Sequence, residues 1–344
     1  MNKTSDAPFI SICIPTFNGM PYIKDLLEEL LKSPERNFEV VISDDGSSDE
    51  TWNYCQKLSS IDSRLKCFRN SNNLGMDANF AKTVSLAEGN YVWFCGQDDI
   101  IFHEGVTSVL TLLKKNPELD FIFLNHEKIT EAKDEEISHE DMCTHGEHDV
   151  FGNGLEEFLC HNNHNLPTFL PKYILKRSLW ESVDVTKYFG TYYCQVGVFL
   201  EVSENFKWAH LDGNYVVGLT PIDGWQSEAD KFTKISLGLC EMLSCVNEGG
   251  RKLNPETLRK LVNKNYKRLI MSFLLIKNKS AQVEQSTINT VKELIRISPP
   301  LIAIIKIIML LPSWMADIIL NLNSFRRVMR KSLMGLHHQG PNFE

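Results

Sequence analysis

Paired cysteines are the first feature that this sequence of 344 residues lacks. Its nine cysteines are scattered, odd in number, and never form a Cys-x-x-Cys pair. A disulfide framework usually has an even number of cysteines, and a cysteine-based zinc site usually contains Cys-x-x-Cys pairs, so both are disfavoured. We therefore expect the reduced, mostly buried thiols of a cytosolic protein.

Long apolar runs are missing as well. The first residues, MNKTSDAPF, hold no apolar core of a signal peptide. Near the other end, the stretch 298–332 is apolar but is interrupted by Lys306, Pro312 and Asp317. Its longest apolar run is far shorter than the roughly 20 residues that cross a bilayer. The sequence therefore predicts a cytoplasmic protein without a simple membrane span.

The stretch 298–332 has a basic end, which suggests what it contacts. Its apolar part is followed by four cations, Arg326, Arg327, Arg330 and Lys331. Apolar residues beside cations are typical of a helix that lies in the interface of an anionic membrane. A buried helical hairpin that packs on the body is the alternative interpretation. We favour peripheral association with the inner face of the cell membrane.

The charge of the chain is divided unevenly. Residues 1–250 carry 20 Lys and Arg against 39 Asp and Glu, whereas residues 251–344 carry 16 against 5. The acidic body disfavours nucleic-acid binding, because it would repel the phosphate backbone. The basic end predicts an anionic partner such as a membrane surface.

Strand and helix patterns alternate over the first 130 residues. The predicted strands are 9–15, 38–45, 65–70, 91–95 and 120–125. Amphipathic helices are expected between them, one of which starts at the S-x-x-E capping box Ser47–Glu50. Such alternation predicts βαβ units, a mostly parallel sheet and helices on both faces. From about residue 230 to 295 the pattern is helical.

Polar clusters follow each of the first four predicted strands. They read PTFN, DDGSSD, NSNNLG and GQDD in chain order. In a parallel sheet, ligands bind at the carboxyl ends of the strands, where these clusters fall together. One such cluster would be an ordinary loop, but four at one edge predict a binding site.

The fourth cluster carries two adjacent carboxylates, Asp98 and Asp99, after the buried strand YVWFC. Neighbouring carboxylates repel each other and resist dehydration, so a compensating group is expected. A divalent cation, Mg²⁺ or Mn²⁺, is the usual one.

Taken as a set, these clusters resemble the family 2 glycosyltransferases, which have the GT-A fold. The residues that carry the resemblance are ISICIPTFNG, VVISDDGSSDET, NNLGMDANF and AEGNYVWFCGQDDI, followed by FHEG. Within the family, the GMDANF and GQDD variants are most similar to abequosyltransferase-type enzymes of bacterial O-antigen synthesis. The resemblance implies a GT-A, Rossmann-like domain over residues 1–228, with a nucleotide-sugar half (8–130) and an acceptor half (131–228). A helical C-terminal region (229–344) would follow.

The resemblance also implies a donor site and a metal ligand. Asp98 would hold Mg²⁺ or Mn²⁺ against the diphosphate of the nucleotide-sugar. Asp44 and Asp45 can accept hydrogen bonds from a pyrimidine base, and Gly46 and Ser47 offer a close backbone approach. The full set of implied donor residues is Pro15, Thr16, Phe17, Asn18, Asp44, Asp45, Gly46, Ser47, Asn73, Gly75, Asp77, Asn79, Gly96, Gln97 and Asp98.

The chain departs from the family at two places. Members usually read D-x-D where this chain has Gly96, Gln97 and Asp98, so one carboxylate is lost and we expect open space beside the glycine. Asp99, Gln97 or water could compensate.

The second departure concerns the base that an inverting transferase needs. The usual acidic pair is absent, and Gln195 stands about where it would be expected. The base candidates that remain are Asp184, Glu181, Glu201 and Asp99, of which Asp184 is the nearest to the expected place.

Five histidines invite a zinc interpretation, but their spacing does not match an ordered zinc site. We assign them to a polar loop on the acceptor side, where His161 or His164 could touch the metal or the acceptor. The five are His139, His145, His148, His161 and His164.

The leading hypothesis is therefore a metal-dependent, inverting glycosyltransferase of O-antigen or lipopolysaccharide synthesis. It would transfer a sugar, such as a deoxyhexose, from a nucleotide-sugar to a lipid-linked oligosaccharide. One alternative is a catalytically degenerate nucleotide- or sugar-binding scaffold. The other is a sugar-phosphate nucleotidyltransferase, which usually has a glycine-rich, basic loop after the first strand that PTFNGMPYI lacks.

Overall fold

The computed structural model of the chain describes residues 9–130, 143–146, 148–220, 229–249 and 253–322. The chain forms two compact units. Unit 1 comprises residues 1–158, 167–189 and 198–221, and unit 2 comprises residues 159–166, 190–197 and 222–344. The boundary predicted at residue 228 lies outside the described residues and stays a prediction.

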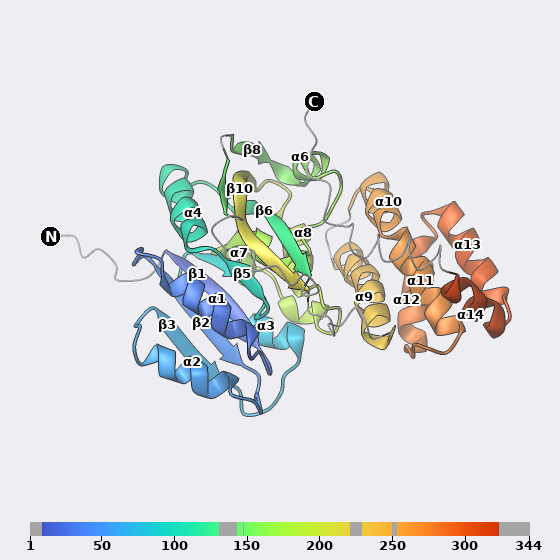
Figure 1. The fold of residues 1–344 in the computed structure, drawn as a ribbon. Coiled ribbons are helices and arrows are strands. Elements are labelled where there is room, and N and C mark those ends of the chain that lie inside the picture. Colours follow the sequence, from blue (N-terminus) through green and yellow to red (C-terminus); the bar gives the residue numbers. More distant parts are fainter. Residues whose placement is uncertain (1–8, 131–142, 147, 221–228, 250–252, 323–344) are drawn as a thin grey trace. The chain divides into compact units, whose positions relative to one another are not determined.

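Unit 1 is built around one mixed β-sheet (Figure 1). Its strands are β1 (Ile10–Thr16), β2 (Phe38–Asp44), β3 (Leu65–Arg69), β4 (Tyr91–Phe94), β5 (Asp99–Ile101), β6 (Phe121–Thr130), β7 (Thr144–His145), β8 (Val150–Asn153), β9 (Tyr173–Lys176) and β10 (Lys207–Thr220). The strands follow the order β3-β2-β1-β4-β9-β6-β10-β5, and β7 and β8 also pair with β10.

The helices come from the segments between these strands. They are α1 (Tyr22–Leu31), α2 (Thr51–Ser59), α3 (Met76–Ser85), α4 (His103–Lys115), α6 (Gly154–His161), α7 (Arg177–Glu181) and α8 (Cys194–Val202), with the 3₁₀ turns η1 (Leu170–Lys172) and η2 (Val185–Tyr188). The α6 and α8 segments each run across a boundary between the two units.

The first four strands form a parallel block, as predicted. β1 lies between β2 and β4, and β3 lies beyond β2. The register places Thr16 opposite Asp44, and Asp44 opposite Arg69, so the carboxyl ends of three strands lie level with one another. The segments that follow these strands therefore leave the sheet from one edge.

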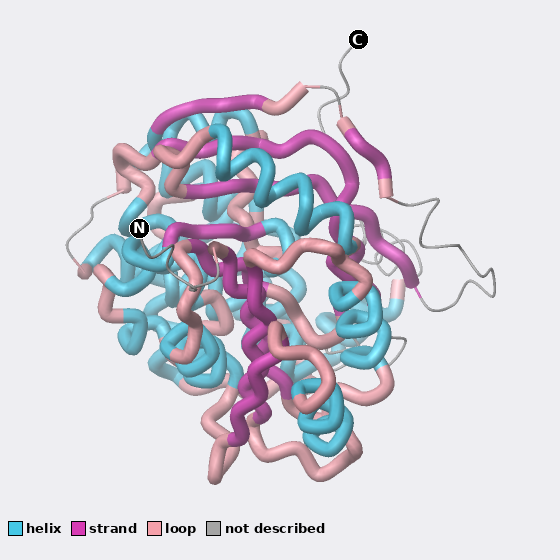
Figure 2. The backbone as a smooth tube through the Cα atoms, turned by 90° about the vertical axis from the view of Figure 1, so that its left-hand side faces the viewer, coloured by secondary structure: helices cyan, strands magenta, loops and turns pink. Residues whose placement is uncertain are grey.

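Helices cover both faces of this block, and Figure 2 shows them alongside the strands. On one face, apolar side chains of α1 and α4 pack with Ile12 and Trp93 in a single buried cluster. On the other face, Phe80 of α3 packs against Phe94 with ring centroids 5.9 Å apart. The strands are buried on both sides, as their apolar runs predict. The predicted α/β class is confirmed.

The second half of the sheet is less regular than expected. β9 pairs antiparallel with both β4 and β6, and β5 pairs antiparallel with β10. β5 is only three residues long and begins at Asp99, directly after the predicted loop. Such short segments carry no periodicity of their own, which is why the sequence did not predict them.

The capping-box prediction was wrong. The helix α2 begins at Thr51, and Glu50 makes no side-chain cap. The Ser47 hydroxyl instead accepts a hydrogen bond from the Asn18 backbone (2.9 Å), while Asp49 accepts one from the Thr51 backbone (3.0 Å). Ser47 is therefore recruited by the neighbouring loop and is not available to cap the helix.

Unit 2 is helical, as predicted for residues 230–295. Its elements are α9 (Ala229–Glu248), α10 (Pro255–Lys264), α11 (Tyr266–Lys277), α12 (Gln285–Ile295), α13 (Pro299–Leu310) and α14 (Ser313–Asn321). α9 packs on α11 and α12, and α13 packs on α11 and α12. The predicted membrane-associating stretch corresponds to α13 and α14 as far as residue 322, and residues 323–332 lie outside the described part.

A candidate donor site at the carboxyl edge of the parallel strands

The loops that follow β1 and β2 are joined by direct hydrogen bonds. The Asn18 backbone donates to Ser47 Oγ (2.9 Å), and the Ser48 backbone donates to Asn18 Oδ1 (2.9 Å). Asn18 has a left-handed backbone, with φ at 49°, which asparagine tolerates better than most residues. The predicted neighbours Thr16–Asn18 and Ser47 therefore lie in one connected structure.

Asp44 lies at the end of β2 and is fully buried. Arg69 Nε lies 3.2 Å from Asp44 Oδ2, and the Ser47 backbone donates to the same carboxylate oxygen at 3.2 Å. The Arg69 guanidinium also donates to the Ser47 carbonyl (2.7 Å) and stacks over the Trp52 ring. The charge of Asp44 is thus neutralised inside the protein.

Asp45 connects the loop after β2 to the loop after β3. Asp45 Oδ1 accepts hydrogen bonds from Asn70 Nδ2 (2.9 Å) and the Leu74 backbone (2.8 Å). Its Oδ2 accepts from the Gly75 backbone (3.0 Å). A carboxylate with three such donors holds the loop in place and needs no further cation.

Other predicted donor residues complete this structure. Buried Asn79 donates to the Ser43 carbonyl (2.9 Å) and accepts from Asn70 (3.0 Å). Asn73 accepts from the Gly75 backbone (2.9 Å), and Asp77 lies buried in the first turn of α3. Gly46 and Gly75 have φ of 80° and 84°, a conformation that favours glycine.

Gln97 ties the fourth cluster to the first. Its Oε1 accepts from Thr16 Oγ1 (2.6 Å) and from the Phe17 backbone (2.8 Å), and its Nε2 donates to the Phe17 carbonyl (3.2 Å). All four polar clusters are thus brought together, as predicted.

Asp98 and Asp99 form the acidic centre of this edge. Burial raises the pKa of Asp98, and only a backbone hydrogen bond opposes that shift. Burial and the charges of Asp99 and Asp98 together also raise the pKa of the Cys95 thiol well above its usual value. Negative charge is therefore concentrated here, and within the described residues Asp98 has no ion-pair partner.

The space beside Gly96 is not open, contrary to expectation. A Cβ atom at this position would lie 2.6 Å from Asp99 Oδ2 and 3.0 Å from Asp98 Oδ1. Both carboxylates therefore converge on the glycine and fill the space that a first aspartate would occupy. A side chain at this position would have to displace the two carboxylates.

This donor set fits a divalent cation. Mg²⁺ and Mn²⁺ prefer oxygen ligands, and the Asp98 and Asp99 carboxylates supply such ligands. Their mutual repulsion is relieved when a cation binds. Asp98 would be the principal ligand, with Asp99 beside it. When bound, such an ion would stabilise negative charge on a ligand at this edge of the sheet.

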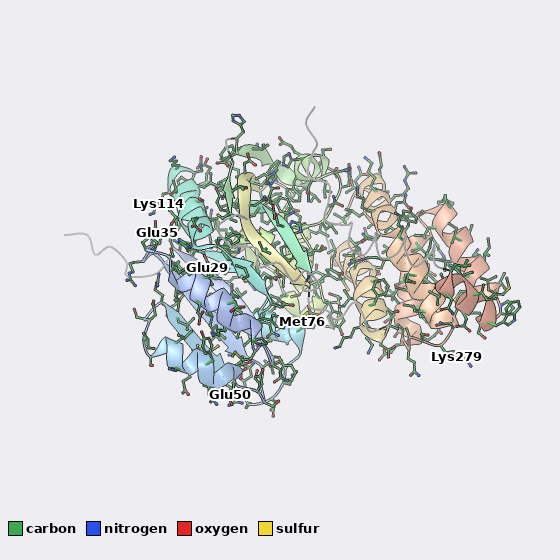
Figure 3. All side chains as sticks on the ribbon, viewed as in Figure 1. Glu29, Glu35, Glu50, Met76, Lys114 and Lys279 are labelled. Atoms are coloured by element: carbon green, nitrogen blue, oxygen red, sulfur yellow. The ribbon has the colours of Figure 1, made fainter. Side chains whose placement is uncertain are left out.

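Apolar side chains lie at the rim of the same edge. Phe17, Leu74 and Met76 are each about half exposed, and the last is labelled in Figure 3. Each is a direct neighbour in the sequence of a residue in the connected loops: Phe17 of Thr16, Leu74 of Gly75, and Met76 of Asp77. Exposed apolar surface beside polar loops is what a base or sugar ring would contact.

Arg69 is a site residue that the sequence analysis missed, and Asn70, the first residue of the NSNNLG cluster, was not among the implied donor residues. Asn70 donates to Asp45 and Asn79, and its backbone donates to the Asp44 carbonyl (2.8 Å). Arg69 is the last residue of β3, and Asn70 follows it directly. Their position at a strand end was the signal that could have identified them.

The base candidates are held in other contacts. Asp184 is fully exposed and caps η2, where its Oδ1 accepts from the Thr186 backbone (3.1 Å) and hydroxyl (2.6 Å). Glu181 pairs with Arg177, and Glu201 pairs with Lys187 (2.6 Å) and accepts from the Tyr188 hydroxyl. Gln195 is buried in unit 2. The catalytic role of Asp184 stays a prediction.

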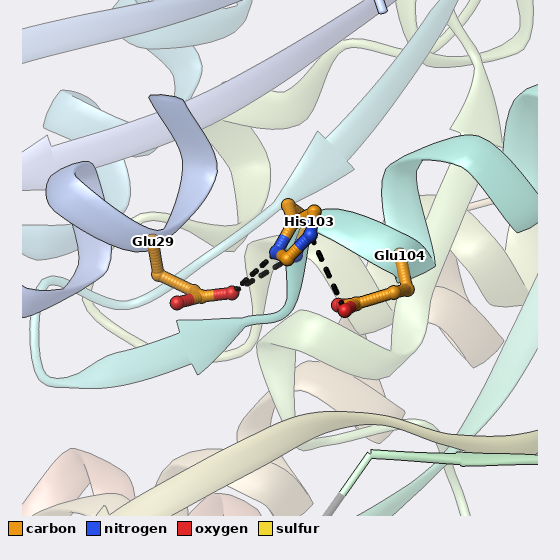
Figure 4. Close-up of side chains that lie close together, drawn as sticks. All are labelled: Glu29, His103 and Glu104. Atoms are coloured by element: carbon orange, nitrogen blue, oxygen red, sulfur yellow. Dashed lines mark hydrogen bonds and ion pairs between the residues drawn. The ribbon is translucent and has the colours of Figure 1, made fainter. Parts of the chain in front are cut away.

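The predicted histidine loop is divided. His148 lies exposed in unit 1 and His145 lies in β7, whereas His161 and His164 belong to unit 2; His139 lies outside the described residues. A different group gathers potential metal ligands in the described part of the chain: Glu29, His103 and Glu104. The His103 ring lies between the two carboxylates, 2.8 Å from Glu29 Oε1 and 3.2 Å from Glu104 Oε1 (Figure 4).

Comparison with known proteins identifies the domain that carries this site. Residues 11–169 match the family model described as "Glycosyl transferase family 2". Residues 11–169 form a family 2 glycosyltransferase domain. The resemblance inferred from the sequence is thus confirmed, and the domain contains the four joined loops, Gly96 and the Asp98–Asp99 pair.

Curated relatives of this glycosyltransferase domain include two bacterial enzymes. The abequosyltransferase RfbV of Salmonella typhimurium is 31% identical over 204 residues, which cover 56% of this chain and 60% of that protein. A Campylobacter jejuni protein named GalNAc(5)-diNAcBac-PP-undecaprenol beta-1,3-glucosyltransferase is 29% identical over 104 residues, or 30% of this chain and 34% of its own length.

Two solved structures share the fold of this chain. S. aureus TarS 1–349 in complex with UDP superposes with a TM-score of 0.60 at 16% identity, covering 98% of this chain and 94% of TarS 1–349. The mannosyltransferase PcManGT from Pyrobaculum calidifontis, in complex with GDP-Man and Mn²⁺, has a TM-score of 0.51 at 13% identity, with 92% and 88% covered. At these identities the likeness concerns the fold alone.

Proposed function

We propose that this protein is a metal-dependent glycosyltransferase of bacterial surface-polysaccharide synthesis. It would transfer a sugar, with a deoxyhexose as the candidate, from a nucleotide-sugar to a lipid-linked oligosaccharide. The observation that carries the proposal is the convergence of four strand-end loops on an acidic centre in which Asp98 has no ion-pair partner among the described residues. Such a site suits a diphosphate that arrives together with a divalent cation.

The proposed reaction is a direct displacement with inversion. An acceptor hydroxyl oxygen attacks the anomeric carbon of the donor sugar and forms the new glycosidic bond. The bond from that carbon to the diphosphate oxygen breaks, and the nucleoside diphosphate leaves with the bonding electrons. The hydroxyl proton passes to a base.

The roles of the site residues follow from their contacts. Asp44, Asp45, Asn70 and Arg69 keep the loops rigid, so that binding a donor requires little ordering. Asp98 and Asp99 would hold Mg²⁺ or Mn²⁺. Phe17 and the other half-exposed rim residues would contact the base or the sugar.

The relatives support the finer parts of this proposal. One is named for the transfer of abequose, and another is named for a PP-undecaprenol-linked acceptor. Two structural neighbours were solved with UDP or with GDP-Man and Mn²⁺. A lipid-linked acceptor would bring the reaction to the inner face of the cell membrane, where residues 298–332 would associate peripherally.

A calorimetric titration tests the proposal directly. Purified protein is titrated with UDP, CDP, GDP and dTDP, each with and without Mn²⁺, and the series is repeated on Asp98→Asn. Asp25→Asn, an exposed carboxylate on α1, serves as the matched control. We expect tight binding of one nucleotide that needs Mn²⁺, is lost in Asp98→Asn and is kept in Asp25→Asn.

A different result would favour one of the alternatives. If none of the four nucleotides binds, the chain is a scaffold that has kept the fold without the activity. If a nucleoside triphosphate binds and reacts with a sugar phosphate, the chain is a nucleotidyltransferase.

A further inference from the structure

The helix α13 in unit 2 is apolar on two opposite sides. Leu301, Ile305 and Ile308 are buried, and α13 packs on α11 and α12. On the other side, Ile307 is 60% exposed and Leu310 is 84% exposed, with Ile304 beside them. A surface helix of a soluble protein normally carries polar residues on its outer side. The outer side of α13 therefore needs a different explanation.

The next helix, α14, continues this apolar surface. Trp314 is 60% exposed, and Ile318 and Leu322 are about half exposed. α13 and α14 are bent by 116° at the short break between them, and together they are apolar enough for a broken span. In the described part of the chain, no helix is by itself both long and apolar enough to cross a membrane. We call the six exposed residues Ile304, Ile307, Leu310, Trp314, Ile318 and Leu322 the apolar hairpin face.

The described charges on and beside the apolar hairpin face are two lysines and one aspartate, the exposed Asp317 of α14. Lys306 is exposed on α13 itself, and Lys277 of α11 donates to the Met309 carbonyl at the end of α13 (2.9 Å). The whole segment 251–344 carries 16 Lys and Arg against 5 Asp and Glu. Exposed apolar side chains within a basic segment complement an anionic lipid surface, which offers acyl chains beneath phosphate groups.

We propose that the apolar hairpin face inserts into the interface of an anionic phospholipid bilayer. The two short helices lie in the plane of the membrane, with Trp314 at the depth of the headgroups and the acyl-chain boundary, where tryptophan is enriched in membrane proteins. The inference deepens the peripheral membrane association of the proposed function by naming the residues that make the contact.

Vesicle flotation tests the insertion. The full chain is mixed with vesicles of phosphatidylcholine, with or without phosphatidylglycerol, at low and at high salt. We expect the wild type to float with the anionic vesicles and to float less at high salt. The triple variant Ile307→Asp, Leu310→Asp and Trp314→Asp should lose about tenfold or more of its partitioning, because three charges would have to enter the apolar layer.

The matched control places charge on exposed apolar residues of unit 1. Ile61 is 73% exposed and Phe151 is 49% exposed, so Ile61→Asp and Phe151→Asp change charge and apolar area in a similar way. These variants should float like the wild type. Circular dichroism of every variant separates loss of binding from loss of folding.

Tryptophan fluorescence gives a second measurement. The sequence has six tryptophans, so the difference between the wild type and Trp314→Phe isolates the signal of Trp314. Lipids that carry a quencher at the acyl-chain boundary should quench this difference signal.

Two results would overturn the proposal. The wild type could stay at the bottom of the gradient with both kinds of vesicle. Alternatively, the wild type could be a dimer that the triple variant turns into a monomer without any flotation, so that a second copy covers the face. The membrane proposal and the donor-site proposal are tested independently, because the flotation experiment uses no nucleotide and the nucleotide titration uses no lipid.

Discussion

Two pairs of adjacent aspartates follow two strands of the same sheet, and they differ in how their charge is compensated. Asp44 and Asp45 after β2 receive Arg69 and a set of hydrogen-bond donors from the backbone and Asn70. Asp98 after β4 has no ion-pair partner among the described residues, and burial raises its pKa.

The difference separates the aspartates that stabilise the loops of the site from those that we propose to take part in donor binding. Carboxylates whose oxygens are already engaged stabilise the loops and contribute to folding. A carboxylate such as Asp98, which is largely buried and has no ion-pair partner among the described residues, costs folding free energy, and a bound cation offsets that cost. The first pair should therefore matter for stability, and the second for donor chemistry.

The largest effect is expected for Asp98→Asn. The rate of Mn²⁺-dependent hydrolysis of the donor sugar should fall by about 100-fold or more, which corresponds to at least ~2.7 kcal/mol. The midpoint of thermal unfolding without metal should stay the same or rise, because a repulsive charge is removed.

Asp25→Asn is the control in the same assay, since Asp25 is exposed on α1. An Asp98→Asn protein that keeps full activity, or that unfolds without metal at a clearly lower temperature, would contradict the separation of roles.

The opposite pattern is expected for Asp45→Asn. Asparagine keeps one acceptor oxygen, but its NH₂ group would face the donors on the other side, either the Gly75 backbone N–H or the Leu74 backbone N–H with Asn70. At least one hydrogen bond would therefore be replaced by a clash between donors. The free energy of unfolding should fall by about 2 kcal/mol. Urea unfolding measures this change. A variant as stable as the wild type would mean that Asp45 does not hold the loop.

The sequence was sufficient to predict the parallel block and the location of the site. The apolar runs 9–15, 38–45 and 91–95 are long enough to show their character, and each ends in a polar cluster. Because parallel strands carry their carboxyl ends to one edge of a sheet, the succession of apolar strands and polar clusters along the chain was enough to predict that the clusters lie together.

The sequence could not show how the side chains share the space at that edge. Gly96 was expected to leave an opening, but its neighbours' carboxylates turn toward it. Ser47 was expected to cap a helix, but the Asn18 backbone donates to it from another loop. Both outcomes depend on contacts between residues far apart in the chain, which no local pattern encodes.

Gly96→Ala tests whether the two carboxylates of the second pair depend on the glycine. The added Cβ would lie 2.6 Å from Asp99 Oδ2 and 3.0 Å from Asp98 Oδ1, so the carboxylates must move apart. We expect a loss of about 1–2 kcal/mol of stability and weaker Mn²⁺ binding, measured by electron paramagnetic resonance of free Mn²⁺. Gly96→Asp restores the family pattern and should also weaken Mn²⁺ binding, because it adds the same Cβ. Tighter binding in Gly96→Asp would show that the space can open after all.

A third acidic pair, Glu29 and Glu104, adds an intermediate case in which a histidine supplies the compensation (Figure 4). Burial by itself would raise the pKa of Glu29, but hydrogen bonds from the His103 ring and from Lys32 outweigh it and hold the pKa below its usual value. A carboxyl whose pKa is lowered by folding stabilises the protein above its ordinary pKa. This contribution is lost as the pH falls through the pKa of the folded state.

Glu29→Gln should therefore give the smallest and the most pH-dependent effect. At pH 7 the free energy of unfolding should fall by about 1 kcal/mol, because the charge-assisted hydrogen bonds to His103 and Lys32 weaken. The difference from the wild type should shrink in acid, where the wild-type carboxyl is itself protonated. Urea unfolding over a pH series measures this convergence, with the exposed Glu118→Gln as control. A difference that stays constant at every pH would mean that packing, and not the charge of Glu29, joins α1 to α4.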